Sequence, residues 1–322
     1  GITAGRGGQL KTAGRGLLPG ADFCCNGAMD LPGGIAMRSN WAGNYQYRAA
    51  GLAVSSSLAE VQDAVRAAAR VRVLGSRHSF NDIADTQGIQ ISLERLTRVG
   101  PVDPAARHVT VEGGIRYGDL APALHREGWA LANLASLPHI SVAGAVATAT
   151  HGSGSETGNL ATSVAGLEIV TAGGEILRLS RRSDPEMLAG AVVSLGALGA
   201  VVGLVLDVEP DYQVRQTVYT GLAHDLLETE FDRLFAFGTS VSVFTDWRGA
   251  RAHSVWVKDR LRDPGAPVAT ECFGAVRADR PLHPLPDGAG EDCTGQMGVP
   301  GPWHERLPHF RMGFTPSRGE EI

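Results

Sequence analysis

Short apolar runs alternate with amphipathic segments along the chain, and their spacing predicts an α+β fold. Leu58, Val61 and Val65 lie three and four residues apart, which is typical of one buried helix face. Ser57 and Glu60 stand in the arrangement of a capping box, so we expect this helix to begin there. Runs rich in branched apolar residues predict strands over 71–74, 89–93, 108–112, 164–170, 175–179 and 200–208.

Two further helices and one hairpin are indicated by the residues at their ends. Gly128 is a common C-terminal cap and closes a helical segment over 117–127. Asp184-Pro185 opens a short helix, because proline suits the first helical position. Ala172-Gly173-Gly174 separates two apolar runs and predicts that they form a hairpin.

The chain changes in composition near residue 211, where small residues give way to aromatic and charged ones. Strands over 212–219, 240–246 and 254–257, with a helix over 225–237, predict a second α+β domain. The Pro- and Gly-rich stretch 263–302 is expected to be a long loop. We therefore expect a first domain over 37–211 and a second, incomplete one over 212–322. Residues 1–36, Gly-rich and without a hydrophobic period, are expected to be disordered or non-native.

Composition excludes several classes of function. The 322 residues are 43% apolar, enough for a sizeable core, and a net charge of −5 without a basic block argues against binding nucleic acid. No apolar run reaches the roughly 18 residues that span a bilayer. Four cysteines lack the spacing of a zinc site or a disulfide framework, so we expect no metal and a cytoplasmic setting; they are Cys24, Cys25, Cys272 and Cys293.

Three segments of small residues carry the candidate chemistry: 73–80 (VLGSRHSF), 136–144 (SLPHISVAG) and 148–154 (TATHGSG). Backbone that approaches a phosphate closely needs small side chains, because larger ones cover the amide groups. We infer a dinucleotide held by main chain and hydroxyls, with His78 beside it. The glycines near residue 199 lack the Rossmann spacing, and no Walker lysine motif exists.

These segments resemble the FAD-binding (PCMH-type) domain of the vanillyl-alcohol-oxidase superfamily. The likeness also runs through 40–44 (NWAGN), 113–117 (GGIRY), 244–248 (FTDWR) and 298–310 (GVPGPWHERLPHF). The SLPHIS and PWHER motifs narrow it to sugar-alcohol and aldonolactone oxidases, and the bacterial alditol (xylitol) oxidases are the most similar group. The resemblance implies an FAD-binding domain followed by a partial α+β substrate-binding domain.

The resemblance also implies a site. His78 would carry the flavin covalently, and Ser136, the expected catalytic residue, would touch both flavin and substrate. The cofactor-binding residues would be Val73, Leu74, Gly75, Ser76, Arg77, His78, Ser79, Ser136, Ser141, Gly144, Thr148, Ala149, Thr150, His151 and Val201. The family often has glycine where this chain has Arg77. The Glu-x-Arg pair, threonine and lysine that the family places around the substrate would lie beyond Ile322.

The implied reaction converts the primary hydroxyl of a polyol to an aldehyde, with molecular oxygen reduced to hydrogen peroxide. An aldonolactone oxidase or dehydrogenase, or an inactive flavin-binding fragment, remain the alternatives.

Several single residues have a plainer interpretation. His78 alone could be an exposed histidine after a strand, His139 is expected to be structural, and His151 either bonds a carbonyl or contacts the flavin. Ser136 could be only a turn residue. The segment from His304 to His309 is one residue too long for a zinc motif and contains Pro308. Residues 246–248 (DWR) are expected to be a salt-bridged domain element, with substrate contact as the alternative.

Overall fold

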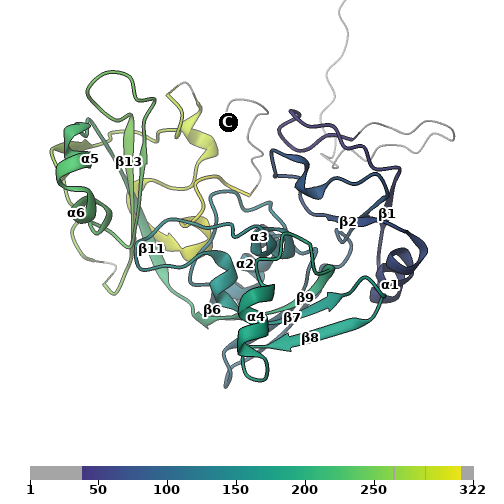
Figure 1. Ribbon diagram of the computed structural model, residues 1–322. Coiled ribbons are helices and arrows are strands. Elements are labelled where there is room, and N and C mark those ends of the chain that lie inside the picture. The colour runs from purple at the N-terminus through teal and green to yellow at the C-terminus, as the bar shows by residue number, and fades with distance from the viewer. Residues whose placement is uncertain (1–37, 264, 287, 313–322) are drawn as a thin grey trace, which may run out of the picture. The chain divides into compact units, whose positions relative to one another are not determined.

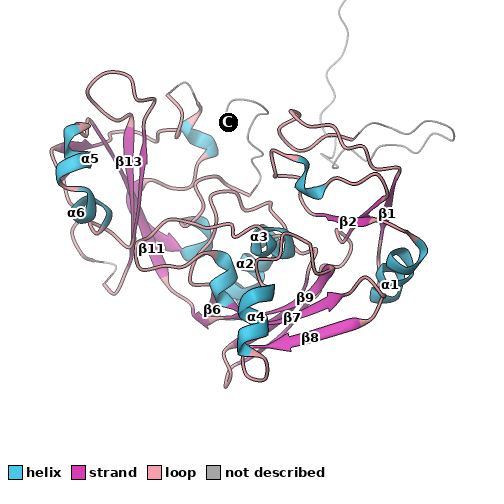
Figure 2. Ribbon diagram, viewed as in Figure 1, coloured by secondary structure: helices cyan, strands magenta, loops and turns pink. Residues whose placement is uncertain are grey.

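The computed structural model describes residues 38–263, 265–286 and 288–312, which all belong to one compact unit of residues 37–322 (Figure 1). The expected extension over residues 1–36 lies outside the described residues. Strands and loops dominate and the helices are short, so the predicted α+β class is confirmed (Figure 2). No helix in these ranges is long and apolar enough to cross a membrane.

The first sheet is small and parallel, and it leads into the candidate site. Its strands, in spatial order, are β1 (Gly51–Val54), β3 (Ile89–Ser92) and β2 (Val71–Leu74). Helix α1 (Leu58–Ala67) buries Val61 and Val65 in the same cluster as Ile91. Its cap is reciprocal, as predicted, because Ser57 Oγ accepts from Glu60 N at 3.2 Å and Glu60 Oε2 accepts from the backbone N of the preceding Ser56 at 2.7 Å.

The second sheet is antiparallel and has the order β4-β5-β9-β7-β8. Its strands are β4 (Val99–Asp103), β5 (His108–Glu112), β7 (Val164–Val170), β8 (Ile176–Ser180) and β9 (Ala200–Asp207). Gly174, at φ 75°, turns the predicted hairpin between β7 and β8. β9 is almost wholly buried because it has a neighbour on each side, as its apolar sequence predicts.

Helices supply the rest of the core over this sheet. They are α2 (Tyr117–Arg126), α3 (Val142–Ala147) and α4 (Pro185–Ala191). Leu120, Val142 and Leu188 from the three helices join one hydrophobic cluster with Leu204 of β9. Figure 1 shows α3 beside α2, so the second small-residue segment is carried on this packed layer.

The third sheet has the order β12-β13-β11-β15-β14, with β16 also on β11. Its strands are β11 (Gln213–Thr220), β12 (Ser240–Phe244), β13 (Ser254–Arg260), β14 (Glu271–Cys272), β15 (Ala275–Arg277) and β16 (Met297–Pro302). The single helix expected over 225–237 is instead two, α5 (Asp225–Thr229) and α6 (Phe231–Phe235). Glu230 lies between them with φ −122° and ψ 18°, outside the helical region.

The expectation of a long loop over 263–302 is wrong, because β14, β15 and β16 lie within it. β15 and β16 share one edge of β11, and the paired residues are 56 to 89 positions apart in sequence, where no local pattern reveals the pairing. Within the described ranges β16 pairs only with β11, and an edge strand tolerates Pro300 and Pro302.

The chain then returns to the first core. Trp303, in the short helix η4 (Trp303–Glu305), is fully buried and belongs to the same hydrophobic cluster as Leu120 and Leu204. A two-strand pair, β6 (Trp129–Ala130) with β10 (Glu209–Pro210), lies just before β11 in the chain. Residues 303–310 are therefore held against the residues that form the candidate site.

Candidate active site

The turn after β2 presents His78. Leu74 is the buried end of the strand, and Gly75, Ser76 and Arg77 lead from it to the histidine. Arg77 has φ 67°, a conformation in which glycine is least strained, and its side chain is exposed. The arginine at a position where the family often has glycine is therefore exposed to solvent, and its Nη1 atom donates to Ser39 O at 3.5 Å. We call residues 75–79 the His78 turn.

The His78 ring lies close to two other rings. Its centroid is 4.7 Å from that of Trp41 and 4.6 Å from that of His139. Burial, with smaller effects of His139 and Arg77, lowers the pKa of His78 to about 3. The imidazole is therefore neutral near pH 7. Its Nε2 atom is buried and has no hydrogen-bond partner among the described residues.

The segment 40–44 fastens the His78 turn from outside. Trp41 N donates to Arg77 O at 2.8 Å, and Asn40 Nδ2 donates to Ser79 O at 3.0 Å. Asn44 Nδ2 donates to the carbonyl of the residue after the turn at 3.0 Å. Trp41 is thus held over His78 by backbone contacts. The resemblance includes this segment, but the residues alone gave no signal for its role.

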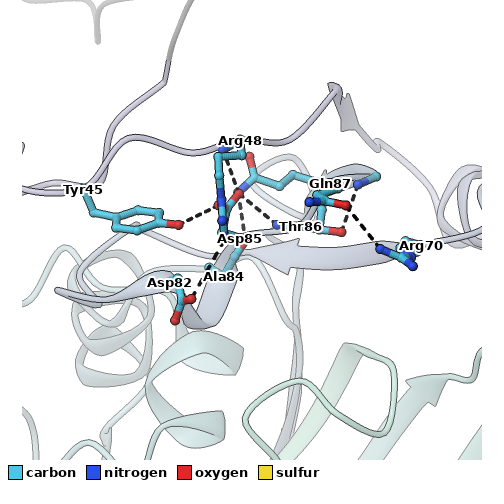
Figure 3. A network of polar contacts seen from close by, with 10 residues as sticks. Tyr45, Arg48, Arg70, Asp82, Ala84, Asp85, Thr86 and Gln87 are labelled. Carbon is cyan, nitrogen blue, oxygen red and sulfur yellow. Dashed lines mark hydrogen bonds and ion pairs between the residues drawn. The ribbon is translucent and has the colours of Figure 1, made fainter.

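Asp85 anchors the same segment (Figure 3). Its carboxylate accepts from Tyr45 Oη at 2.7 Å, from Arg48 Nε at 2.9 Å and from Arg48 N at 2.9 Å. Burial alone would raise the pKa of Asp85, but the hydrogen bonds from Arg48 and Tyr45 outweigh it and hold the pKa below its ordinary value. Asp85 is therefore a buried carboxylate that joins residues 45–48 to the loop before β3.

The second small-residue segment lies directly against the His78 turn. Ser141 N donates to Ser76 Oγ at 3.2 Å. A Cβ added to Gly144 would lie 2.7 Å from Ser141 Oγ, and one added to Gly75 would lie 3.0 Å from the same atom. Ser141 Oγ is buried and has no partner within the described ranges. A side chain at either glycine would therefore crowd the Ser141 hydroxyl where the two backbones meet.

The third segment follows α3. Thr148 Oγ1 donates to Gly144 O at 3.0 Å and contacts Thr150 Oγ1 at 3.1 Å. Ala149 between them has φ 54°, a strained conformation for a residue with a Cβ. His151 is exposed, and its Nδ1 atom lies 2.8 Å from Gly152 O. This loop is therefore continuous with the second segment at Gly144.

Two of the expected cofactor residues belong to the core. Val201 is buried in β9, and a Cβ on Gly113 would lie 2.4 Å from its carbonyl oxygen. Val73 packs against the cluster under α1. Both side chains therefore pack against apolar neighbours.

Ser136 meets a residue that the sequence analysis did not consider for the site. Its Oγ lies 2.6 Å from Nδ1 of His309. The His304 ring instead lies 4.7 Å from that of His125. The two histidines of the segment that the sequence excluded as a zinc motif thus contact different partners. The only sequence signal for this contact was the family resemblance carried by the SLPHIS and PWHER motifs.

Residues 246–248 do not form the expected salt bridge. Asp246 Oδ1 accepts from Arg248 N at 2.8 Å, and neither side chain forms an ion pair in the part of the chain that the structure describes. The Trp247 ring, 75% exposed, lies 5.6 Å from that of His224.

The arrangement fits a flavin nucleotide. His78 and Ser141 offer buried polar atoms, two glycines let backbones approach closely, and threonine hydroxyls line the next loop. A family model described as an FAD binding domain matches residues 49–180, which contain all of these groups.

Curated oxidases and dehydrogenases are similar in sequence to this chain. Alditol oxidase from Streptomyces sp. (strain IKD472 / FERM P-14339) is 46% identical over 289 residues, which cover 88% of this chain and 67% of that protein. L-gulonolactone oxidase from Bos taurus is 35% identical over 59% of the chain and 44% of its own length. L-gulono-1,4-lactone dehydrogenase from Mycobacterium tuberculosis (strain ATCC 25618 / H37Rv) is 42% identical over 53% of the chain and 40% of its own length.

Fold and site together define an FAD-dependent oxidoreductase. The chain belongs to the alditol oxidase-like family of the vanillyl-alcohol-oxidase superfamily. It spans about two thirds of alditol oxidase and less than half of the two lactone enzymes.

Proposed function

We propose that this protein oxidises the primary hydroxyl of an alditol, such as xylitol or sorbitol, to an aldose and reduces molecular oxygen to hydrogen peroxide. The observation that carries the proposal is the similarity to alditol oxidase, which extends over 88% of the chain and so includes both the His78 turn and Ser136. We further propose the cytoplasm as its location, consistent with the free, buried thiol of Cys272.

We propose that the FAD is attached covalently through His78. Attachment needs an uncharged imidazole, and the low pKa of His78 supplies one. The attachment would replace one hydrogen of the flavin 8α-methyl group and one of the imidazole. The two electrons released would pass to molecular oxygen, the acceptor also proposed for turnover.

Alcohol oxidation removes a hydride from carbon and a proton from the hydroxyl. The bound flavin supplies the hydride acceptor. Ser136 is proposed to hydrogen-bond the reacting hydroxyl, since the segment that carries it also carries His139, whose ring centroid lies 4.6 Å from that of His78. Three residues of chain span at most about 10–11 Å, so Ser136 is kept near the His78 turn.

A peroxide assay on the flavin-loaded protein tests the proposed function. Xylitol and sorbitol should give hydrogen peroxide, and Ser136→Ala should lower turnover while flavin content stays near normal. Loss of flavin from Ser136→Ala would instead assign Ser136 to cofactor binding. L-gulono-1,4-lactone tests the second candidate, which the similarity to the two lactone enzymes supports. Oxidation of the lactone with no turnover of either polyol would replace the proposed function by that one.

A further inference from the structure

Ser136 and His309, 173 residues apart, are joined by side chain and backbone. Besides the contact of 2.6 Å between Ser136 Oγ and His309 Nδ1, Ser136 O accepts from His309 N at 3.1 Å and from Phe310 N at 3.3 Å. The backbone bonds alone would hold the two segments together. The side-chain contact adds a restraint on the serine hydroxyl itself.

The imidazole of His309 is fixed by aromatic neighbours. Its residue is 6% exposed, and its ring centroid lies 5.1 Å from that of Trp256 and 5.4 Å from that of Phe244. Burial, aided by the nearby charge of Lys258, holds the pKa of His309 well below its ordinary value. The ring is therefore neutral, and its contact with Ser136 is a hydrogen bond between uncharged groups.

The backbone on both sides of His309 is held by buried polar groups. Lys258 Nζ donates to Leu307 O, although Lys258 is only 2% exposed. Thr294 Oγ1 donates to Pro308 O at 2.6 Å, and Thr294 N donates to His309 O at 2.9 Å. Burying an ammonium group is costly unless its geometry is well satisfied. These bonds to three successive carbonyls, those of residues 307–309, leave His309 little freedom.

We propose that His309 is a positioning residue for the reaction, because its Nδ1 atom fixes the orientation of the Ser136 hydroxyl. A serine hydroxyl has one hydrogen and two lone pairs. The bond to Nδ1 occupies one of these and leaves the other two directed for substrate and flavin. A group on the 303–310 segment thereby sets the geometry of a group beside the His78 turn. This inference rests on the proposed role of Ser136.

Three variants of His309 separate positioning from packing. His309→Phe keeps a buried aromatic ring but removes Nδ1, and we expect kcat to fall about 100-fold with a smaller change in KM, the scale expected for a misplaced group. His309→Asn carries an amide atom near the position of Nδ1 and should recover at least about a tenth of the original kcat, whereas His309→Gln carries its amide farther out and should not. His304→Asn is the matched control and should leave turnover unchanged. Equal kcat in the Phe variant and the original protein would overturn the inference.

Histidine NMR provides a measurement that does not depend on turnover. With ¹⁵N-labelled histidine in the flavin-loaded protein, Ser136→Ala should shift the Nδ1 signal of His309 and leave the signals of His304 in place. An unmoved His309 signal would overturn the inference.

The outcomes distinguish the inference from the function on which it rests. If Ser136→Ala retains full turnover, the proposed role of Ser136 is wrong and that of His309 falls with it. If Ser136→Ala is impaired while His309→Phe is not, only the inference about His309 is wrong. If neither the unmodified protein nor any variant yields peroxide from a polyol, the proposed function is rejected. The NMR shift then decides whether His309 Nδ1 is bonded to the Ser136 hydroxyl.

Discussion

The His78 turn and the Ser136–His309 contact are two parts of one site built in different ways. The turn is formed by five consecutive residues and fastened from outside by a partly exposed segment that carries Trp41. The contact joins distant residues inside a core of aromatic rings and a buried lysine. Substitutions around the turn should therefore affect the cofactor more than stability, and substitutions around the contact should affect stability and geometry together.

A pair of tryptophan substitutions gives the largest contrast. Trp256 is fully buried, so Trp256→Ala should lower the free energy of unfolding by about 3–5 kcal/mol. Trp41 is only half-buried, and Trp41→Ala should cost about 1–2 kcal/mol while lowering flavin content, because its ring covers His78. Guanidinium unfolding and flavin absorbance measure both effects. Equal losses of stability would contradict the comparison.

Lys258 should make stability depend on pH. Burial lowers its pKa to about 7 from an ordinary value of 10.5, so between these pH values the unfolded chain binds a proton that the folded chain does not. Stability should therefore rise with pH above 7, by up to about 2–3 kcal/mol by pH 9, and Lys258→Met should remove that rise. Unfolding at pH 7, 8 and 9 checks it, with the exposed Arg233→Met as control. If the free energy of unfolding of Lys258→Met still rises with pH as in the original protein, Lys258 is not the group responsible.

Substitutions of Asp85 and Asp82 test the same comparison at the segment that holds the His78 turn. Asp85→Asn should cost about 2 kcal/mol, because it replaces charge-assisted hydrogen bonds from Arg48 and Tyr45 with weaker ones. Asp82 lies 4.0 Å from Arg48 and is mostly exposed, so Asp82→Asn should cost less than about 0.5 kcal/mol.

The lowered pKa of Asp85 also fixes the sign of its pH dependence. Its contribution is complete above the ordinary carboxyl pKa and is lost as the pH falls through the lower folded-state value. Thermal unfolding between neutral and acid pH should therefore converge for Asp85→Asn and the unmodified protein. A gap that persists in acid would contradict this assignment.

The two regions also differ in how far the sequence predicted them. The strand before His78, the capped helix α1 and the hairpin β7–β8 follow from local patterns, and the structure confirms them. Their content of small residues located the three segments, because close backbone approach constrains composition locally.

The contact with His309 could not be read in the same way. His309 reaches Ser136 through β16 and η4, and β16 is an edge strand whose partner lies about 80 residues earlier. Lys258 is one of two lysines in the chain, yet nothing in its neighbours marks it as buried. Tertiary pairing, rather than periodicity, decides both positions.

The proposal that His78 holds the flavin is the centre of this account, and peptide mapping by mass spectrometry tests it directly. Protein expressed with flavin available, then denatured and digested, should yield one peptide that carries the mass of FAD, with the added mass on His78. His78→Ala should lose the added mass, while the exposed His151→Ala should keep it. An FAD adduct on another residue, or one that survives His78→Ala, would contradict the account.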